Sequence, residues 1–194
     1  MTSMVLATRT CFVMAVVIAF AQIAFAASQS ANTTLSLNEA EFISVQFIAL
    51  KEPGLLEREN FTLIKAVLRD NGLYSRYMFV WVRKDGDVEL PDMIGISLDP
   101  SSGKVKFYHR IKEPVQVSTS PNLSEEDATR IATDLCGFVP ILSESKLMVL
   151  PMPDKQRLIW RVRLSGESKN LRIQGATFMI DAHNGEVIAI DFMR

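Results

Sequence analysis

The sequence contains an internal duplication, and this feature constrains the fold more than any other. Three short motifs recur in the same order, each about 80 to 90 residues further on. They are LSLNEA at 35–40 and LSEEDA at 123–128, FVWVR at 79–83 and LIWRVR at 158–163, and ISLDPSSGKV at 96–105 and FMIDAHNGEV at 178–187. Collinear motifs predict two units of similar fold at 35–110 and 123–194. The Pro- and Ser-bearing segment 111–122 between them is predicted to be a linker.

Each unit is predicted to begin with a helix. Ser36 and Ser124 are suitable N-caps, and Glu39 and Asp127 lie three residues later, where a capping-box partner belongs. Apolar residues then follow with helical spacing, which predicts one buried stripe per helix. The stripes are Ala40, Ile43, Phe47 and Ile48 in the first unit and Ala128, Ile131, Ala132 and Leu135 in the second.

Strands are predicted after each helix. Leu158, Trp160, Val162 and Leu164 alternate with Ile159, Arg161 and Arg163, the period of a half-buried strand. The segments 146–152, 175–181 and 186–192 complete the second unit. We therefore expect an α+β fold made of two tandem units. Each unit is expected to pack one helix on an antiparallel sheet of about four strands.

The run DAHNG at 181–185 could be a catalytic or metal-binding loop, or the turn of a hairpin. Its counterpart in the first copy, DPSSG at 99–103, keeps only the Asp and the Gly. An Asp can accept hydrogen bonds from backbone amides in a turn, and a Gly readily adopts positive φ. We therefore interpret Asp99, Gly103, Asp181 and Gly185 as structural turn residues.

No catalytic, cofactor-binding or metal-binding residues are predicted. His109 and His183 occupy non-equivalent positions, and neither belongs to a spacing typical of zinc ligands. The sequence contains no nucleophile elbow, phosphate-binding Gly-rich loop or HExxH helix. Trp81 and Trp160 stand at what the motifs suggest are matched strand positions, and we expect both to anchor the cores.

Residues 1–26 have the pattern of a signal peptide. Arg9 precedes an uncharged apolar run at 11–26, which ends with Ala24 and Ala26 where a signal peptidase requires small residues. Cleavage would leave 27–34 as a flexible lead-in and place the protein in the periplasm, the cell envelope or outside the cell. The alternative is an uncleaved anchor, and only then would the chain contact a membrane.

Charge and cysteine content exclude further classes. Without Arg9, 20 of the 21 basic residues remain against 22 acidic ones, so the net charge becomes about −2 and nucleic acid is not an expected partner. Cys136 would be the only remaining cysteine, which rules out an internal disulfide and favours a buried thiol. Asn-x-Ser/Thr sequons occur at Asn32, Asn60 and Asn122.

The order of the capped helix LSEEDATRIA, the strand LIWRVRL and the hairpin FMIDAHNGEVI resembles the PepSY domain family. The resemblance covers about 123–192, and 35–108 is a more diverged likeness in which Ser44 replaces the second helical Ala. It implies a cystatin-like layer of helix on sheet and a binding or inhibitory role. It supplies no catalytic residues.

Three functions remain open on the sequence alone. The first is a non-enzymatic exported module that binds a protein, with restraint of a protease as one form. The second is a structural adaptor of the envelope, held by an uncleaved N-terminal segment. The third is an enzyme or ligand carrier with a pocket between helix and sheet. The relative packing of the units and the oligomeric state are also open.

Overall fold

The computed structural model describes residues 34–72, 74–167 and 175–193. The predicted leader 1–26 and all but the last residue of the lead-in 27–34 lie outside the described residues. In the described ranges no helix is both long and apolar enough to span a membrane.

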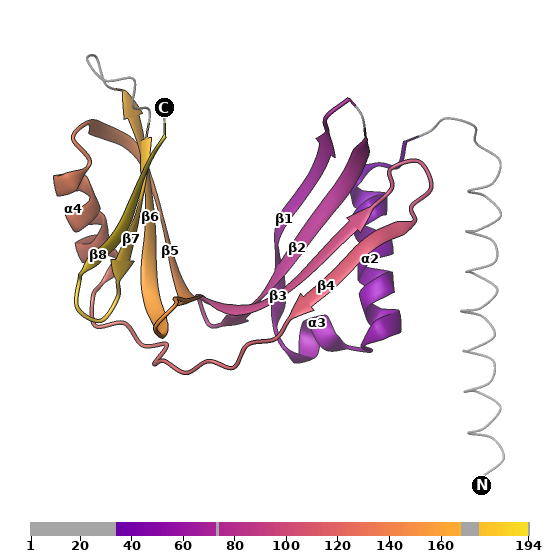
Figure 1. Cartoon of the computed structure of the whole chain (residues 1–194), viewed down its shortest axis with the longest axis horizontal. Coiled ribbons are helices and arrows are strands. Elements are labelled where there is room, and N and C mark those ends of the chain that lie inside the picture. Colours follow the sequence, from indigo (N-terminus) through magenta and orange to yellow (C-terminus); the bar gives the residue numbers. More distant parts are fainter. Residues whose placement is uncertain (1–33, 73, 168–174, 194) are drawn as a thin grey trace, which may run out of the picture.

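The predicted α+β class, with a helix packed on antiparallel strands in each half, is confirmed (Figure 1). The elements of the first half are α2 (Leu37–Lys51), α3 (Leu55–Arg58), β1 (Phe61–Asp70), β2 (Ser75–Asp85), β3 (Val88–Leu98) and β4 (Val105–Ile111). Those of the second half are α4 (Glu125–Leu135), β5 (Val139–Pro151), β6 (Gln156–Glu167), β7 (Gly175–Asp181) and β8 (Val187–Met193). The short helix α3 was not expected from the sequence, and β5 is longer than the predicted strand at 146–152.

The two long helices begin with similar caps. In α2, the Ser36 hydroxyl accepts from the Glu39 amide at 3.3 Å, and the Glu39 carboxylate accepts from the Ser36 amide at 2.8 Å, which makes a full capping box. In α4, the Asp127 amide donates to the Ser124 hydroxyl at 3.1 Å, and that hydroxyl donates to the Asp127 carboxylate at 3.0 Å. The Glu39 carboxylate also accepts from the Ser36 hydroxyl at 2.8 Å, so the two caps differ in the bond to the N-cap amide, which the Asp127 side chain, one methylene shorter, does not make.

Each helix packs its stripe on one face of the sheet. Ala40 and Ile48 are buried in the first core, and Ala128 and Ala132 are buried in the second. The prediction that Leu135 belongs to the buried stripe is wrong, because it is 50% exposed. Cys136, which is 3% exposed and follows Ala132 by four residues, takes that place.

All eight strands form a single sheet, in which β3 joins the two halves. Along one edge, β3 pairs with β2; along its other edge, β4 covers Met93 to Leu98. Beyond the end of β4, β5 pairs in parallel with β3 through Glu89 and Met148. The units are therefore joined edge to edge, and the β2–β3 hairpin of the first unit reaches into the second.

The tip of this hairpin completes the second core. Val88 and Leu90 are 7% and 5% exposed, and they pack with the buried residues of α4, β5, β6 and β7. Further along the same strand, Ile94 and Ile96 belong to the first core. One strand therefore contributes apolar side chains to both halves.

The bend in β3 between the two cores is held by Asp92, which is 2% exposed. Its carboxylate accepts from the Arg83 Nε of β2 and from the Glu113 backbone amide, both at 2.6 Å. This arrangement fixes the point at which the chain leaves the first unit. Breaking such a buried ion pair leaves an unpaired charge, which costs several kcal/mol.

The predicted linker 111–122 is extended and attached to both units. Gln156 at the start of β6 accepts from the Gln116 amide at 2.8 Å and donates to the Pro114 carbonyl at 2.9 Å. Val115 and Val117 pack against the second core. The linker thus follows one path along the joint instead of spanning open solvent.

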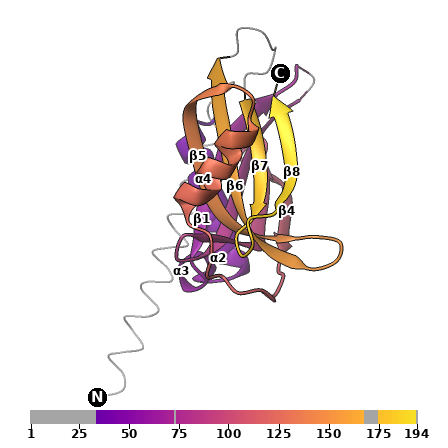
Figure 2. The same cartoon turned by 90° about the vertical axis from the view of Figure 1, so that its left-hand side faces the viewer.

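The sheet is bent so that its two halves face one another. In Figure 1, α2 and α3 cover the outer face of the first half and α4 covers the outer face of the second. The faces of β1–β2 and β5–β6 that no helix covers are turned toward each other across an opening. Figure 1 shows the two halves joined at their lower end, and the view in Figure 2 shows them one behind the other.

Replacing Leu90 with Ala is expected to lower the free energy of unfolding by about 3 kcal/mol, since it leaves a cavity in the second core. The matched control is Leu50→Ala, because Leu50 is 73% exposed; its effect should stay below about 0.5 kcal/mol. Urea denaturation followed by circular dichroism measures both. Equal effects would contradict the assignment of Leu90 to that core.

Candidate functional site

The Asp99 turn joins β3 to β4. Its carboxylate Oδ1 accepts from the backbone amides of Ser101 and Ser102, each at 3.0 Å. The Gly103 amide donates to the Asp99 carbonyl at 2.9 Å, and Gly103 has φ of +66°, which a side chain would strain. These bonds close the backbone of the turn, and Asp99 Oδ2 also forms an ion pair with Lys106 at 3.4 Å.

The Asp181 turn joins β7 to β8 in a similar way. Asp181 Oδ1 accepts from the His183 amide at 2.9 Å, and the Gly185 amide donates to the Asp181 carbonyl at 2.9 Å. Glu186 forms an ion pair with Arg157 of β6 at 3.1 Å, which raises the pKa of that guanidinium. Among the described residues, no group of three or more His, Cys, Asp and Glu side chains could hold a metal ion.

Each turn also holds the start of the helix in its unit. The Leu35 amide, one residue before the α2 N-cap, donates to the Pro100 carbonyl at 2.8 Å. In the second unit the Leu123 amide donates to the Ala182 carbonyl at 2.9 Å. The repeated Asp and Gly therefore shape a turn that anchors helix to sheet, and this role accounts for the similarity of the two motifs.

The predicted core anchors Trp81 and Trp160 are 3% and 9% exposed. Their predicted equivalence is wrong. Trp160 pairs across the sheet with Ile180, the residue before Asp181, and its indole N–H donates to the Leu123 carbonyl at 2.8 Å. In the first unit that position belongs to Tyr77.

Tyr77 pairs with Leu98, the residue before Asp99, and its hydroxyl donates to the Leu35 carbonyl. Trp81 lies four residues further along β2, opposite Ile94. Its ring packs beside Phe79, with ring centroids 5.9 Å apart. Different aromatic residues thus make the same bond to the residue before the helix cap.

The other residues singled out by the sequence lie in structural roles. The buried Cys136 thiol donates to the Thr133 and Phe138 carbonyls at the end of α4. Among the sequons, Asn32 lies outside the described residues. The side-chain amides of Asn60 and Asn122 donate to the carbonyls of Lys84 and His183, respectively.

A polar cluster on the helical side of the first unit is likewise structural. Arg110 of β4 forms ion pairs with Glu52 and Glu59, which flank the turn between α2 and β1. Burial raises the pKa of the neighbouring Tyr108, and Glu52 adds to this shift. The cluster attaches the end of α2 and all of α3 to the edge strand β4.

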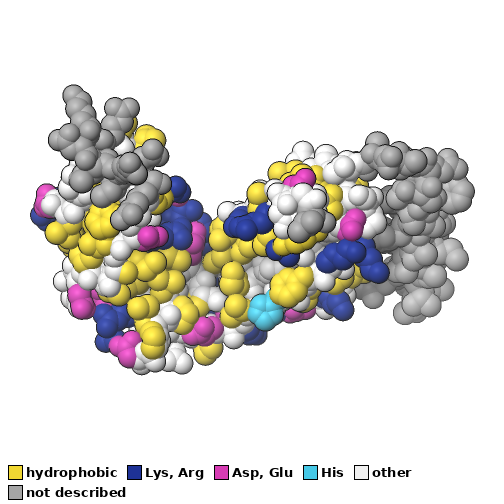
Figure 3. Space-filling model, turned by 45° about the horizontal axis from the view of Figure 1, so that its top comes forward, with side chains coloured by type: hydrophobic (Ala, Val, Ile, Leu, Met, Phe, Trp, Pro, Cys, Tyr) yellow, Lys and Arg dark blue, Asp and Glu magenta, His cyan; other side chains and the backbone are white. Residues whose placement is uncertain are grey.

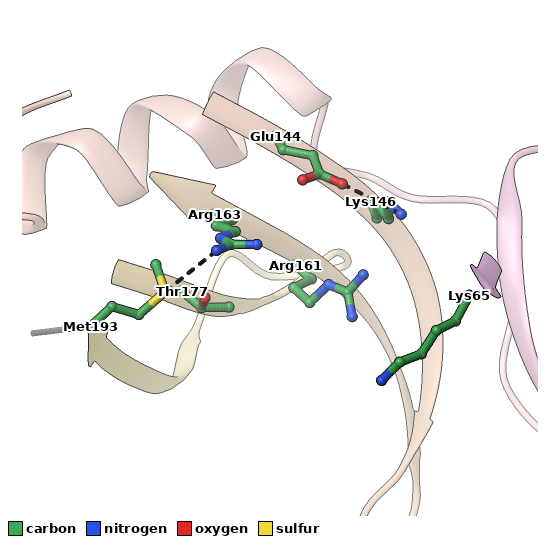
Figure 4. Close-up of a pocket in the computed structure, with 7 residues that line it drawn as sticks. All are labelled: Lys65, Glu144, Lys146, Arg161, Arg163, Thr177 and Met193. Carbon is green, nitrogen blue, oxygen red and sulfur yellow. Dashed lines mark hydrogen bonds and ion pairs between the residues drawn. The ribbon is translucent and has the colours of Figure 1, made fainter. Parts of the chain in front are cut away.

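A groove of about 640 Å³ lies between the two halves of the sheet. Figure 3 shows this hollow, with Lys and Arg side chains on both of its walls. Its lining combines side chains from both units: Lys65 of β1, Glu144 and Lys146 of β5, Arg161 and Arg163 of β6, Thr177 of β7 and Met193 of β8 (Figure 4). We refer to this feature as the inter-unit groove.

The cations of the inter-unit groove differ in how far they are neutralised. Lys146 lies 3.4 Å from the Glu144 carboxylate and 3.9 Å from that of the buried Glu89. Among the described residues, the one hydrogen bond recorded for the Arg163 side chain goes to the Met193 sulfur, at 3.7 Å, and Arg163 lies opposite Glu144 in the register of β5 and β6. For Lys65 and Arg161, the described part of the chain offers no ion-pair partner. Figure 4 shows Lys65 reaching from β1 toward Arg161.

Sequence reasoning missed the inter-unit groove. The alternation in 158–164 predicted a half-buried strand, and Arg161 and Arg163 do lie on the face opposite Trp160 and Val162, although Ile159 on that face is buried as well. What it could not indicate is that a second sheet faces them, because that depends on how the units are joined. No sequence motif marks the joint.

Comparison with known proteins supports the fold. No protein-family model and no curated protein matches the chain. Among solved structures, the Bacillus megaterium YpeB C-terminal domain is similar with a TM-score of 0.54 and 16% identity, over 84% of this chain and 68% of that chain. That coverage exceeds either unit, so the likeness in fold extends over both. A candidate lipoprotein from Clostridium difficile 630 aligns with a TM-score of 0.31 and 11% identity, over 77% of this chain and 90% of that one.

The Asp99 turn should contribute stability in a pH-dependent way. The Ser102 amide that donates to its carboxylate lowers the pKa of Asp99 below the ordinary value. A carboxyl group whose pKa is lower in the folded than in the unfolded state stabilises the fold at pH values above its unfolded-state pKa. This stabilisation is lost as the pH falls through the folded-state pKa. We expect Asp99→Ala to cost about 1 kcal/mol at neutral pH and clearly less at about pH 3.

Urea denaturation at both pH values measures this difference. Asp134→Ala is the control, because Asp134 is an exposed residue of α4 for which the structure records no polar contact. Its small effect should be the same at both pH values. An Asp99→Ala effect that did not change with pH would show that the carboxylate charge does not stabilise the turn.

Proposed function

We propose that this chain is an exported, non-enzymatic module of the cell envelope that binds another protein through the inter-unit groove. The proposal also assigns the chain to two PepSY-like units, the second closer to the family pattern than the first. The observation that carries it is the composite lining of the groove, to which both units contribute. One unit alone could not form this surface, so the groove is a feature that the two units have only together.

The chemistry of the lining favours binding over catalysis. Long cationic side chains dominate it, together with one carboxylate, one hydroxyl and one thioether. In the described part of the groove no acid–base or nucleophile–base pair converges on a common point, as acyl or phosphoryl transfer would need. The turn carboxylates Asp99 and Asp181 are engaged by backbone amides.

Export rests on the leader pattern in 1–26. Restraint of a protease is one form of the binding role, and it rests on the PepSY resemblance. The alternative, an envelope adaptor anchored by an uncleaved leader, shares the groove and differs only in the N-terminus. Mass determination of the protein from its own cells separates the two, because a mature chain beginning at Ala27 excludes the anchor.

Site-specific photo-crosslinking in the cells that produce the protein tests the binding role. A photoreactive phenylalanine analogue replaces Thr177 in the groove, and the matched control replaces Thr133 on the exposed side of α4. We expect a discrete protein adduct from position 177 and none from position 133. Equal labelling at both positions, or no adduct at either, would refute the proposal. An adduct that mass spectrometry identifies as a protein other than a peptidase would remove the protease role alone.

A further inference from the structure

The inter-unit groove holds positive charge at positions where a sheet normally avoids it. Lys146 of β5 and Arg161 of β6 lie directly opposite each other in the antiparallel register. Like charges in such a pair destabilise a sheet. Lys146 is neutralised by Glu144 and Glu89, whereas Arg161 has no ion-pair partner among the described residues.

The facing strands β1 and β2, from which Lys65 lines the groove, repeat this arrangement on the same face. On β1 and β2, Arg69 lies directly opposite Arg76 in the register. Both lie on the same face of their strands as Lys65, which is the face away from the first core. The Arg76 guanidinium lies over the Tyr74 ring, 5.2 Å from its centroid. Its buried Nε has no hydrogen-bond partner in the described part of the chain. Within the described ranges, cations without an ion-pair partner therefore lie on both of the facing sheet surfaces.

Apolar side chains lie between these cations. Val67 stands between Lys65 and Arg69 on β1, and Met78 and Val80 follow Arg76 on the same face of β2. All three are half-buried, and none belongs to the first core. A purely ionic polymer such as polyphosphate would leave these surfaces without a partner. A peptide can offer carboxylates and apolar side chains together.

We infer that the inter-unit groove binds an acidic peptide segment of a partner protein, in which carboxylates alternate with small apolar side chains. This inference rests on the proposed binding function and specifies the chemistry of its partner. Carboxylates would accept charge-assisted hydrogen bonds from Arg161 and Arg163, for which the planar guanidinium group is well suited. Binding would also relieve the repulsion between opposite cations on each wall.

Fluorescence anisotropy with a short labelled peptide in which Glu alternates with Val and Ser tests the inference on the mature protein. A peptide with Gln in place of Glu is the control ligand, and it should bind at least about tenfold more weakly. Affinity for the Glu peptide should fall as salt is raised, because exposed charges are screened. Failure of the Glu peptide to bind saturably would overturn the inference.

The matched pair of variants is Lys65→Gln/Arg161→Gln in the groove and Lys104→Gln/Lys155→Gln at exposed positions outside it. Each removes two positive charges. The groove pair should weaken peptide binding about tenfold, and the outer pair less than about twofold. Equal weakening would show attraction by net charge alone and would overturn the inference.

Two further comparisons complete the test. The groove variant should melt at or above the temperature of the unsubstituted protein, because it removes Arg161 from a like-charge pair; Arg163→Gln provides a second variant if it does not. Polyphosphate or vesicles with anionic phosphatidylglycerol that bound more tightly than the Glu peptide would overturn the choice of a peptide. If the Glu peptide fails but crosslinking at position 177 gives an adduct, the inference falls and the proposed function stands.

Discussion

The structure depends on the crossing of one hairpin from the first unit into the second. The tip of the β2–β3 hairpin supplies Val88 and Leu90 to the second core. The bend in β3 that follows is held by the buried Asp92. Without this crossing the two layers of helix on sheet would be joined only by the segment 111–122. With it, a single sheet continues through both halves and bends between them. The inter-unit groove exists because of that bend.

Within each unit, the duplicated motifs solve a local problem in the same way. A helix must be attached to its sheet at the end where its amide groups lack partners. In both units a turn closed by an Asp side chain accepts the amide before the helix cap. An aromatic side chain on the sheet then donates to the carbonyl of that same residue. The run DAHNG at 181–185, which could have been a catalytic loop, is thus a turn that attaches the helix to the sheet.

The residues that predicted the fold well are those governed by local rules. Helix starts at Ser36 and Ser124 and the hairpins at Asp99 and Asp181 follow from capping and turn chemistry. The false equivalence of Trp81 and Trp160 has a physical reason. Side chains in a strand alternate with a period of two, so a shift of four residues leaves every side chain on its own face. Both tryptophans therefore remain buried, and periodicity alone could not reveal that Tyr77 is the true counterpart of Trp160.

The inter-unit groove lay beyond sequence reasoning because it is formed by contacts between distant segments. Arg161 and Lys65 are each unremarkable as charged strand residues, and only the crossing hairpin brings their strands face to face. The same holds for Leu90, which lies on a strand of the first unit although its side chain completes the second core. Long-range strand pairing forms the groove, whereas the local motifs set the helix caps and the turns.

The coupling of the two units can be tested through the single tryptophan that each contains. In Trp81→Phe the remaining fluorescence reports the second unit, and in Trp160→Phe it reports the first, while far-ultraviolet circular dichroism reports both. If the hairpin joins the units into one cooperative structure, fluorescence and circular dichroism will give the same urea midpoint within each variant. Midpoints that separate would contradict the account, because they would show the two halves unfolding independently of the strand they share.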